Sequence, residues 1–147
     1  HIVFSSAPNT IEKIRAYGKQ AKARGSKLLI IDNLKHIRET KQYQGQTQKF
    51  LDYSMQLKHI RDDLDMPMVV VHHSNEDGTT RHSRDIDADS DITIKLSASD
   101  ESIFASAENN YTSRDYVDLK VEKNRDGMTP FLNLEFIKKI QTFKVKS

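Results

Sequence analysis

Hydrophobic and polar positions alternate along the chain in blocks that predict strands and helices in turn. Residues 1–4 predict a short strand. Residues 11–24 repeat apolar side chains at the spacing of one helix face, with Asn9 as the expected N-cap and Gly25 as the expected end of the helix. Residues 28–31 form a continuous apolar run of strand length. Such a run is typical of a strand that is buried on both faces of a parallel sheet.

The middle of the chain repeats this order. Residues 39–47 are polar and predict a mobile loop, and residues 50–64 carry apolar positions at the spacing of an amphipathic helix. Residues 68–71 predict a second buried strand. The polar stretch 74–89 contains a glycine and predicts a long loop.

The C-terminal part predicts a third strand and a hairpin. Residues 92–96 have the pattern of a strand. Residues 116–123 and 131–136 roughly alternate apolar and polar side chains around Asp126-Gly127, which predicts an antiparallel hairpin. The whole order predicts an α/β fold, with a mostly parallel sheet, helices on both faces and a C-terminal antiparallel hairpin. We expect residues 1–147 to form a single partial domain.

Composition narrows the class of protein only slightly. The chain has 147 residues, a formal net charge of +2 and no cysteine, which excludes a disulfide framework and a thiolate metal site. The mildly basic balance permits nucleic-acid binding through a local patch without demanding it. The apolar runs are too short to span a bilayer. We therefore expect a cytoplasmic protein without a membrane partner.

Polar side chains follow two of the predicted strands. Asp32 ends the first apolar run, and His72 and His73 follow the second. Functional groups gather at the carboxyl ends of the strands in such sheets. Asp32 could hold magnesium there, or it could simply cap a turn. His73 and its neighbour could sense a phosphate, remain solvated, or join His82 in a metal site.

Cationic side chains lie in the loops and in the hairpin. Lys123 and Arg125 are two positions apart near the hairpin turn, so they could reach a phosphate together across a subunit interface, as an arginine finger does. Other cations follow the two strand ends and could contact DNA phosphates: Lys35, Arg38, Lys41, Arg81 and Arg84. A plain solvated surface explains each group about as well.

Taken in order, these segments resemble the DnaB-like hexameric replicative helicases. Residues 28–34 are similar to the family's Walker B segment, and residues 68–75 to its next strand end, where some phage primase-helicases also carry histidine. Residues 83–91 are similar to the family segment "SGAIEQDAD", although Arg84 replaces its glycine. Residues 123–127 are similar to the family hairpin "KNRNG".

The resemblance implies a RecA-like P-loop NTPase core. Its implied function is part of the motor of a replicative DNA helicase, which uses ATP (or another NTP) and Mg²⁺ to translocate on single-stranded DNA and unwind duplex. The implied partners are single-stranded DNA and neighbouring subunits of a homo-oligomeric ring, expected to be a hexamer. Asp32 is then the metal ligand and His73 the phosphate sensor. Lys123 and Arg125 would reach the nucleotide of the neighbouring subunit.

One required motif is absent from the sequence. No G-x-x-x-x-G-K-[ST] phosphate-binding loop occurs among the 147 residues. We therefore expect the chain to be a fragment cut upstream and to be inactive by itself. Two alternatives stay open: a RecA/RadA- or KaiC-like ATPase, and a non-catalytic RecA-like assembly module.

Overall fold

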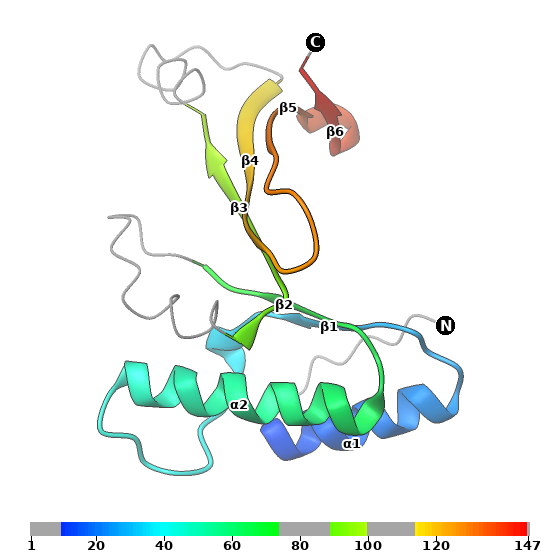
Figure 1. Cartoon of the computed structure of the whole chain (residues 1–147), viewed down its shortest axis with the longest axis vertical. Helices are drawn as coiled ribbons and strands as arrows, with labels where there is room; N and C mark the ends of the chain where they lie inside the picture. The colour runs from blue at the N-terminus through cyan, green and yellow to red at the C-terminus, as the bar shows by residue number, and fades with distance from the viewer. Residues whose placement is uncertain (1–9, 74–88, 100–113, 147) are drawn as a thin grey trace. The chain divides into compact units, whose positions relative to one another are not determined.

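The computed structural model describes residues 10–73, 89–99 and 114–146 (Figure 1). The chain divides into two compact units, one ending at Asp89 and the other beginning at Ser90. The predicted strand at residues 1–4 lies outside the described residues. Within the described ranges, no helix is long and apolar enough to cross a membrane.

The first unit contains two helices and a pair of parallel strands. Its elements are α1 (Ile11–Ala23), β1 (Leu29–Asp32), the 3-10 helix η1 (Leu34–His36), α2 (Gln46–Leu64) and β2 (Met68–Val71). Strands β1 and β2 pair in parallel, with Leu29 opposite Met68 and Asp32 opposite Val71. The two parallel strands predicted from continuous apolar runs are thereby confirmed.

Both helices cover the same face of this strand pair (Figure 1). The core that they share with the strands is built from buried aliphatic and aromatic side chains of α1, α2, β1, η1 and the residues that follow them: Ile11, Ile14, Ile31, Leu34, Ile37, Phe50, Tyr53, Leu57, Ile60, Leu64 and Met66. On the other face Ile30 is 61% exposed and Val69 47%. Burial on both faces was predicted, but the described residues cover only one. An apolar run does not specify where its second cover lies.

The first helix differs from its prediction at the cap and on its buried face. Thr10, not Asn9, is the N-cap, and its hydroxyl accepts a hydrogen bond from the Lys13 backbone N–H at 3.4 Å. Tyr17 is exposed, whereas Gly18 is buried. A Cβ at position 18 would lie only 2.5 Å from Leu64 Cδ1, so the close approach of α1 and α2 requires glycine there.

The polar loop before α2 is anchored to that helix. The Asp52 carboxylate accepts hydrogen bonds from Lys41 Nζ at 2.9 Å, from the Tyr43 hydroxyl at 2.7 Å and from Gln56 Nε2 at 2.6 Å. We call these four residues the Asp52 cluster. It connects the predicted mobile loop to the second turn of α2, which begins at Gln46 and is therefore longer than predicted. The helix ends at Asp65, a residue in the left-handed conformation.

The second unit is an antiparallel sheet in the order β3-β4-β5-β6. It consists of β3 (Ile92–Ala98), β4 (Arg114–Asn124), β5 (Phe131–Ile137), the 3-10 helix η2 (Lys138–Ile140) and β6 (Thr142–Val145). The predicted hairpin is confirmed as β4 and β5. Strand β3 was expected in a parallel sheet, but it pairs antiparallel with β4. Strand β6 was not predicted.

One face of this antiparallel sheet is almost entirely apolar. The register places Ile94 opposite Val121 and Leu96 opposite Leu119, and alternate residues of a strand share a face. Among the described residues of this unit, Leu134 is the one buried hydrophobic side chain. Several large hydrophobic side chains on the same face are exposed: Ile92, Ile94, Leu96, Leu132, Phe143 and Val145. We call this surface the apolar sheet face.

Candidate active site

The carboxyl ends of β1 and β2 meet at one edge of the parallel strand pair. Asp32 is the last residue of β1 and lies opposite Val71, the last residue of β2. His72 and His73 follow directly. The structure therefore brings Asp32 and the two histidines to the same edge, where α/β sheets place their functional groups.

The Asp32 carboxylate is available at this edge. Its side chain is exposed, and it forms no hydrogen bond or ion pair with the residues that the structure describes. Magnesium is held in nucleotide sites by one or two carboxylates together with water and substrate phosphates. A single open carboxylate fits that requirement. Within residues 10–73, 89–99 and 114–146, no group of three or more histidines and carboxylates could hold a metal by itself.

The two histidines have different surroundings. The His72 ring packs against Phe50 of α2, with the ring centroids 5.4 Å apart, and is half-buried. His73 is exposed. Successive residues of an extended chain point to opposite sides, so one ring is used for packing while the other stays open to a ligand. The third histidine of the metal alternative, His82, lies outside the described residues.

The segment after Asp32 is fixed by a buried leucine and by a cap. The Asn33 side chain accepts a hydrogen bond from the Lys35 backbone N–H at 3.0 Å, and Leu34 is 1% exposed. This anchored turn presents Lys35 and Arg38 to solvent. Lys41 is different because its ammonium is paired with Asp52. The other two DNA candidates, Arg81 and Arg84, lie outside the described residues.

The hairpin that carries Lys123 and Arg125 belongs to the second unit. Thr93 pairs with Lys123 whereas Ile94 pairs with Val121, so β4 has a bulge next to Lys123. Strand β4 ends at Asn124, and Arg125 lies in the turn. The expectation that Lys123 and Arg125 share a side assumed strand alternation through both residues. That alternation is broken at the bulge and at the turn.

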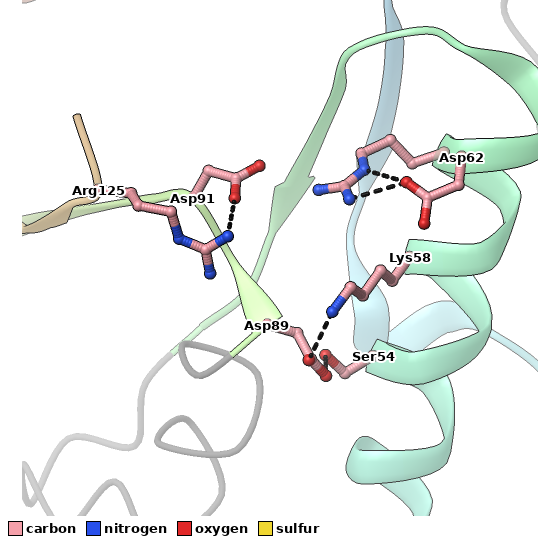
Figure 2. Close-up of polar contacts among 7 residues, drawn as sticks. Ser54, Lys58, Asp62, Asp89, Asp91 and Arg125 are labelled. Carbon is pink, nitrogen blue, oxygen red and sulfur yellow. Dashed lines mark hydrogen bonds and ion pairs between the residues drawn. The ribbon is translucent and has the colours of Figure 1, made fainter.

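The Arg125 side chain is oriented by an aspartate. Its Nη1 lies 3.0 Å from Asp91 Oδ1, and its backbone N–H donates to the Asp91 carbonyl, also at 3.0 Å (Figure 2). The turn itself is closed by Asn124, whose Nδ2 donates to the Met128 carbonyl at 2.9 Å. Sequence reasoning had given Asp91 no role. Its only signal was its place in a segment that resembles a family motif.

Asp89 forms a second contact that the sequence did not reveal. Its carboxylate accepts a hydrogen bond from the Ser54 hydroxyl at 2.9 Å and lies 3.7 Å from Lys58 Nζ (Figure 2). Ser54 and Lys58 are one turn apart on α2, so a single carboxylate can reach both. Within the first unit, this contact attaches the chain at Asp89 to the helix.

The family of the chain follows from its sequence and its fold together. Residues 1–145 match the sequence profile of the DnaB-like helicase C-terminal domain. The chain belongs to this family. The match spans both units, and the resemblance found in the Walker B, strand-end and hairpin segments is thereby confirmed.

Solved structures show the same fold. One of them, the ATPase domain of a DnaB-like replicative helicase, has a TM-score of 0.77 and 21% identity; 95% of this chain and 52% of that chain are matched. Another DnaB-like replicative helicase, described with its interactions with primase, has a TM-score of 0.73 and 22% identity; 95% of this chain and 36% of that chain are matched. The DnaB-like domain studied here thus spans about half, or less, of these relatives. No relative is found among curated protein sequences.

Proposed function

We propose that this chain is the Walker B and hairpin part of the motor of a replicative DNA helicase. In this proposal residues 1–147 form one partial RecA-like domain, and the intact protein hydrolyses ATP or another NTP, translocates on single-stranded DNA and unwinds duplex. It acts as a homo-oligomeric ring, most simply a hexamer, in the cytoplasm. The observation that carries the proposal is the open Asp32 carboxylate, beside His73, at the strand edge of a DnaB-like fold.

Asp32 and His73 would act on the nucleotide of their own subunit. Asp32 would hold Mg²⁺, directly or through water, and the ion would neutralise charge on the phosphates. His73 would donate a hydrogen bond to the terminal phosphate. Its position one residue after the packed His72 supports this role, because the backbone there is held by the contact of His72 with Phe50.

Lys123 and Arg125 would act on the nucleotide of a neighbouring subunit. An arginine finger must project from the surface of its own subunit, and the Arg125 side chain is 57% exposed in the hairpin turn. Lys123 lies beside the bulge of β4, and bulges frequently occur next to active sites, where they change the direction of a side chain.

Lys35, Arg38, Lys41, Arg81 and Arg84 are the proposed contacts to single-stranded DNA. Lys35 and Arg38 are exposed on a turn anchored by Leu34, which supports a contact with phosphates. Lys41 would have to exchange its contact with Asp52 for a phosphate, so we expect its contribution to the salt dependence of binding to be smaller.

The test of the proposed function is ATP hydrolysis by the intact protein. We expect Asp32→Asn to lower kcat by about a hundred-fold or more, because removing a charged ligand of the ion weakens stabilisation of the transition state. Asp65→Asn is the matched control. Asp65 is an exposed aspartate of the same unit in the left-handed conformation, which asparagine tolerates. Equal activity of the two variants would contradict the assignment of Asp32.

The alternative is a non-catalytic RecA-like assembly module. The absence of a phosphate-binding loop from these 147 residues favours it. Sequencing the coding region upstream distinguishes the two functions, since the motor requires an intact phosphate-binding loop there and the module does not. The family match favours the helicase over a RecA/RadA- or KaiC-like ATPase.

A further inference from the structure

Asp91 and Arg125 are connected twice within the second unit. One contact joins the side chains, with Arg125 Nη1 3.0 Å from Asp91 Oδ1. The other joins the backbones, with the Arg125 N–H 3.0 Å from the Asp91 carbonyl oxygen. Figure 2 shows the carboxylate and the guanidinium pointing toward one another. The backbone bond fixes the distance between the two residues, and the side-chain bond fixes the direction of the guanidinium.

The register of the sheet causes this contact. Ile92, the first residue of β3, pairs with Asn124, the last residue of β4. Asp91 and Arg125 are the next residues outward on each strand, so they continue the same antiparallel ladder by one step. The pair is therefore built into the sheet rather than depending on a mobile side chain that happens to lie nearby.

The geometry leaves most of the guanidinium available. Arginine carries five N–H donors in a planar fork, and only Nη1 is used by Asp91. With the residues that the structure describes, Arg125 forms no other side-chain hydrogen bond or ion pair. A carboxylate on one nitrogen can thus hold the plane of the fork while the remaining donors bind two oxygens of a phosphate.

The choice of Asp91 among nearby carboxylates is specific. Asp126 is adjacent to Arg125 in sequence and is also exposed to solvent, yet it forms no ion pair with any described residue. Asp89 is engaged by Ser54 and Lys58. Of these three aspartates only Asp91 contacts the guanidinium.

We infer that Asp91 is a positioning residue for Arg125, the residue proposed above to reach the nucleotide of a neighbouring subunit. The inference rests on that proposed function. Asp91 does not touch the nucleotide. It restricts Arg125 to the rotamers that project from the hairpin, so less conformational freedom is lost when the transition state forms. An exposed ion pair is weak, so the expected effect is modest.

The experiment is steady-state ATP hydrolysis by the intact oligomeric protein with five variants: Asp91→Ala, Asp91→Asn, Arg125→Ala, the double variant Asp91→Ala with Arg125→Ala, and Asp126→Ala as the matched control. We expect Asp91→Ala to lower kcat about two- to five-fold with KM nearly unchanged. Asp91→Asn keeps an acceptor oxygen and should recover most of the activity. Asp126→Ala should behave as the unsubstituted protein.

The double variant separates positioning from a merely structural role. If Asp91 acts only through Arg125, adding Asp91→Ala to Arg125→Ala has no further effect on kcat. An additive loss, or full activity of Asp91→Ala, overturns the inference while leaving the role of Arg125 intact. Arg125→Ala itself should lower kcat about a thousand-fold. Full activity of that variant overturns the proposed function instead. If Asp91→Ala does not fold, Asp91→Asn and its double variant supply the same cycle.

Discussion

At the scale of single residues, the molecule assigns different tasks to side chains that look equivalent in the sequence. His72 is half-buried against Phe50, whereas His73 is exposed at the strand end. The Asp32 carboxylate is open toward the described residues, whereas the Asp52 carboxylate accepts three hydrogen bonds. Residues with open donors or acceptors at a sheet edge are suited to binding. Residues whose polar atoms are already satisfied contribute to stability instead.

The histidine pair yields a prediction at this scale. In the intact protein, His73→Ala should lower kcat for ATP hydrolysis about a hundred-fold, as expected for the loss of one donor to a charged transition state. His72→Ala should instead lower the free energy of unfolding by about 1 kcal/mol, because it removes the ring contact with Phe50.

Measuring kcat and the thermal midpoint for both variants checks this division. The reverse result, in which His72→Ala abolishes hydrolysis at an unchanged midpoint and His73→Ala is fully active, would transfer the role of phosphate sensor to His72.

At the scale of elements, the Asp52 cluster joins a loop to a helix. Burial raises the pKa of Asp52, but the hydrogen bonds from Tyr43, Lys41 and Gln56 outweigh it, so the pKa of this carboxyl lies below its ordinary value. For Tyr43, burial and the neighbouring Asp52 carboxylate both raise the pKa. The loop is thus held by charge-assisted bonds that require the ionised aspartate.

The lowered pKa of Asp52 predicts how stability depends on pH. A carboxyl whose pKa is lower in the folded state stabilises the fold above its unfolded pKa, and this contribution is lost as the pH falls through the folded pKa. Asp52→Asn should therefore lower the free energy of unfolding by about 1 kcal/mol near neutral pH, and by much less at about pH 3.

Urea titrations of the protein at the two pH values measure the difference. Asp62→Asn is the control, because among the described residues the Asp62 side chain pairs only with Arg61 of its own helix and lies at the exposed surface. A loss of stability for Asp52→Asn that is the same at both pH values would exclude the ionised carboxylate as its source.

The contact of α1 with α2 is the second feature at this scale. Gly18 faces Leu64, which is 2% exposed, and the helices are also joined by Arg15 with Asp63 and by the Lys22 ammonium with the Leu64 carbonyl. Because Leu64 is buried, its methyl group has little room to move away from an added Cβ.

Gly18→Ala should lower the free energy of unfolding by about 1 kcal/mol. The cost of overpacking against Leu64, about 1–3 kcal/mol, exceeds the gain of about 1 kcal/mol in helix propensity. Gly45→Ala, at a position with no atom within 4 Å of an added Cβ, is the comparison and should cost less. Chemical denaturation measures both, and a stabilised Gly18→Ala variant would show that the helices can separate at no cost.

At the scale of the whole molecule, each unit has an apolar surface that its own described residues do not cover. In the first unit Ile30 and Val69 are exposed on the open face of the strand pair. In the second unit the apolar sheet face is exposed. Exposed apolar patches of this kind mark surfaces of association. The chain also spans only 52% of the solved ATPase domain whose fold it shares.

We therefore expect the 147-residue chain alone to self-associate through its apolar faces. Sedimentation velocity should show oligomers at micromolar concentrations, and Ile94→Lys with Leu96→Lys should shift the protein toward the monomer by placing charge on the apolar sheet face. Thr93→Lys, at a position whose side chain faces the opposite side, is the control. A monomer before any substitution would contradict this expectation.

Local sequence patterns determined the elements and the chemistry of their ends. The parallel strands β1 and β2, the two helices and the β4–β5 hairpin follow from apolar spacing and from Gly25 and Asp126-Gly127. The position of Asp32 after an apolar run followed in the same way, since a buried strand delivers the residue after it to the sheet edge. These features depend on neighbours within a few residues, which is why the sequence alone predicts them.

Only the tertiary structure decided what depends on residues far apart. The antiparallel pairing of β3, the strand β6, the single covered face of β1 and β2, and the contact of Asp91 with Arg125 all depend on which segments meet. A short apolar run fits either strand direction, and an aspartate does not indicate which arginine it will face. Strand register supplies that information, because moving a strand by one residue exchanges every side chain between the two faces.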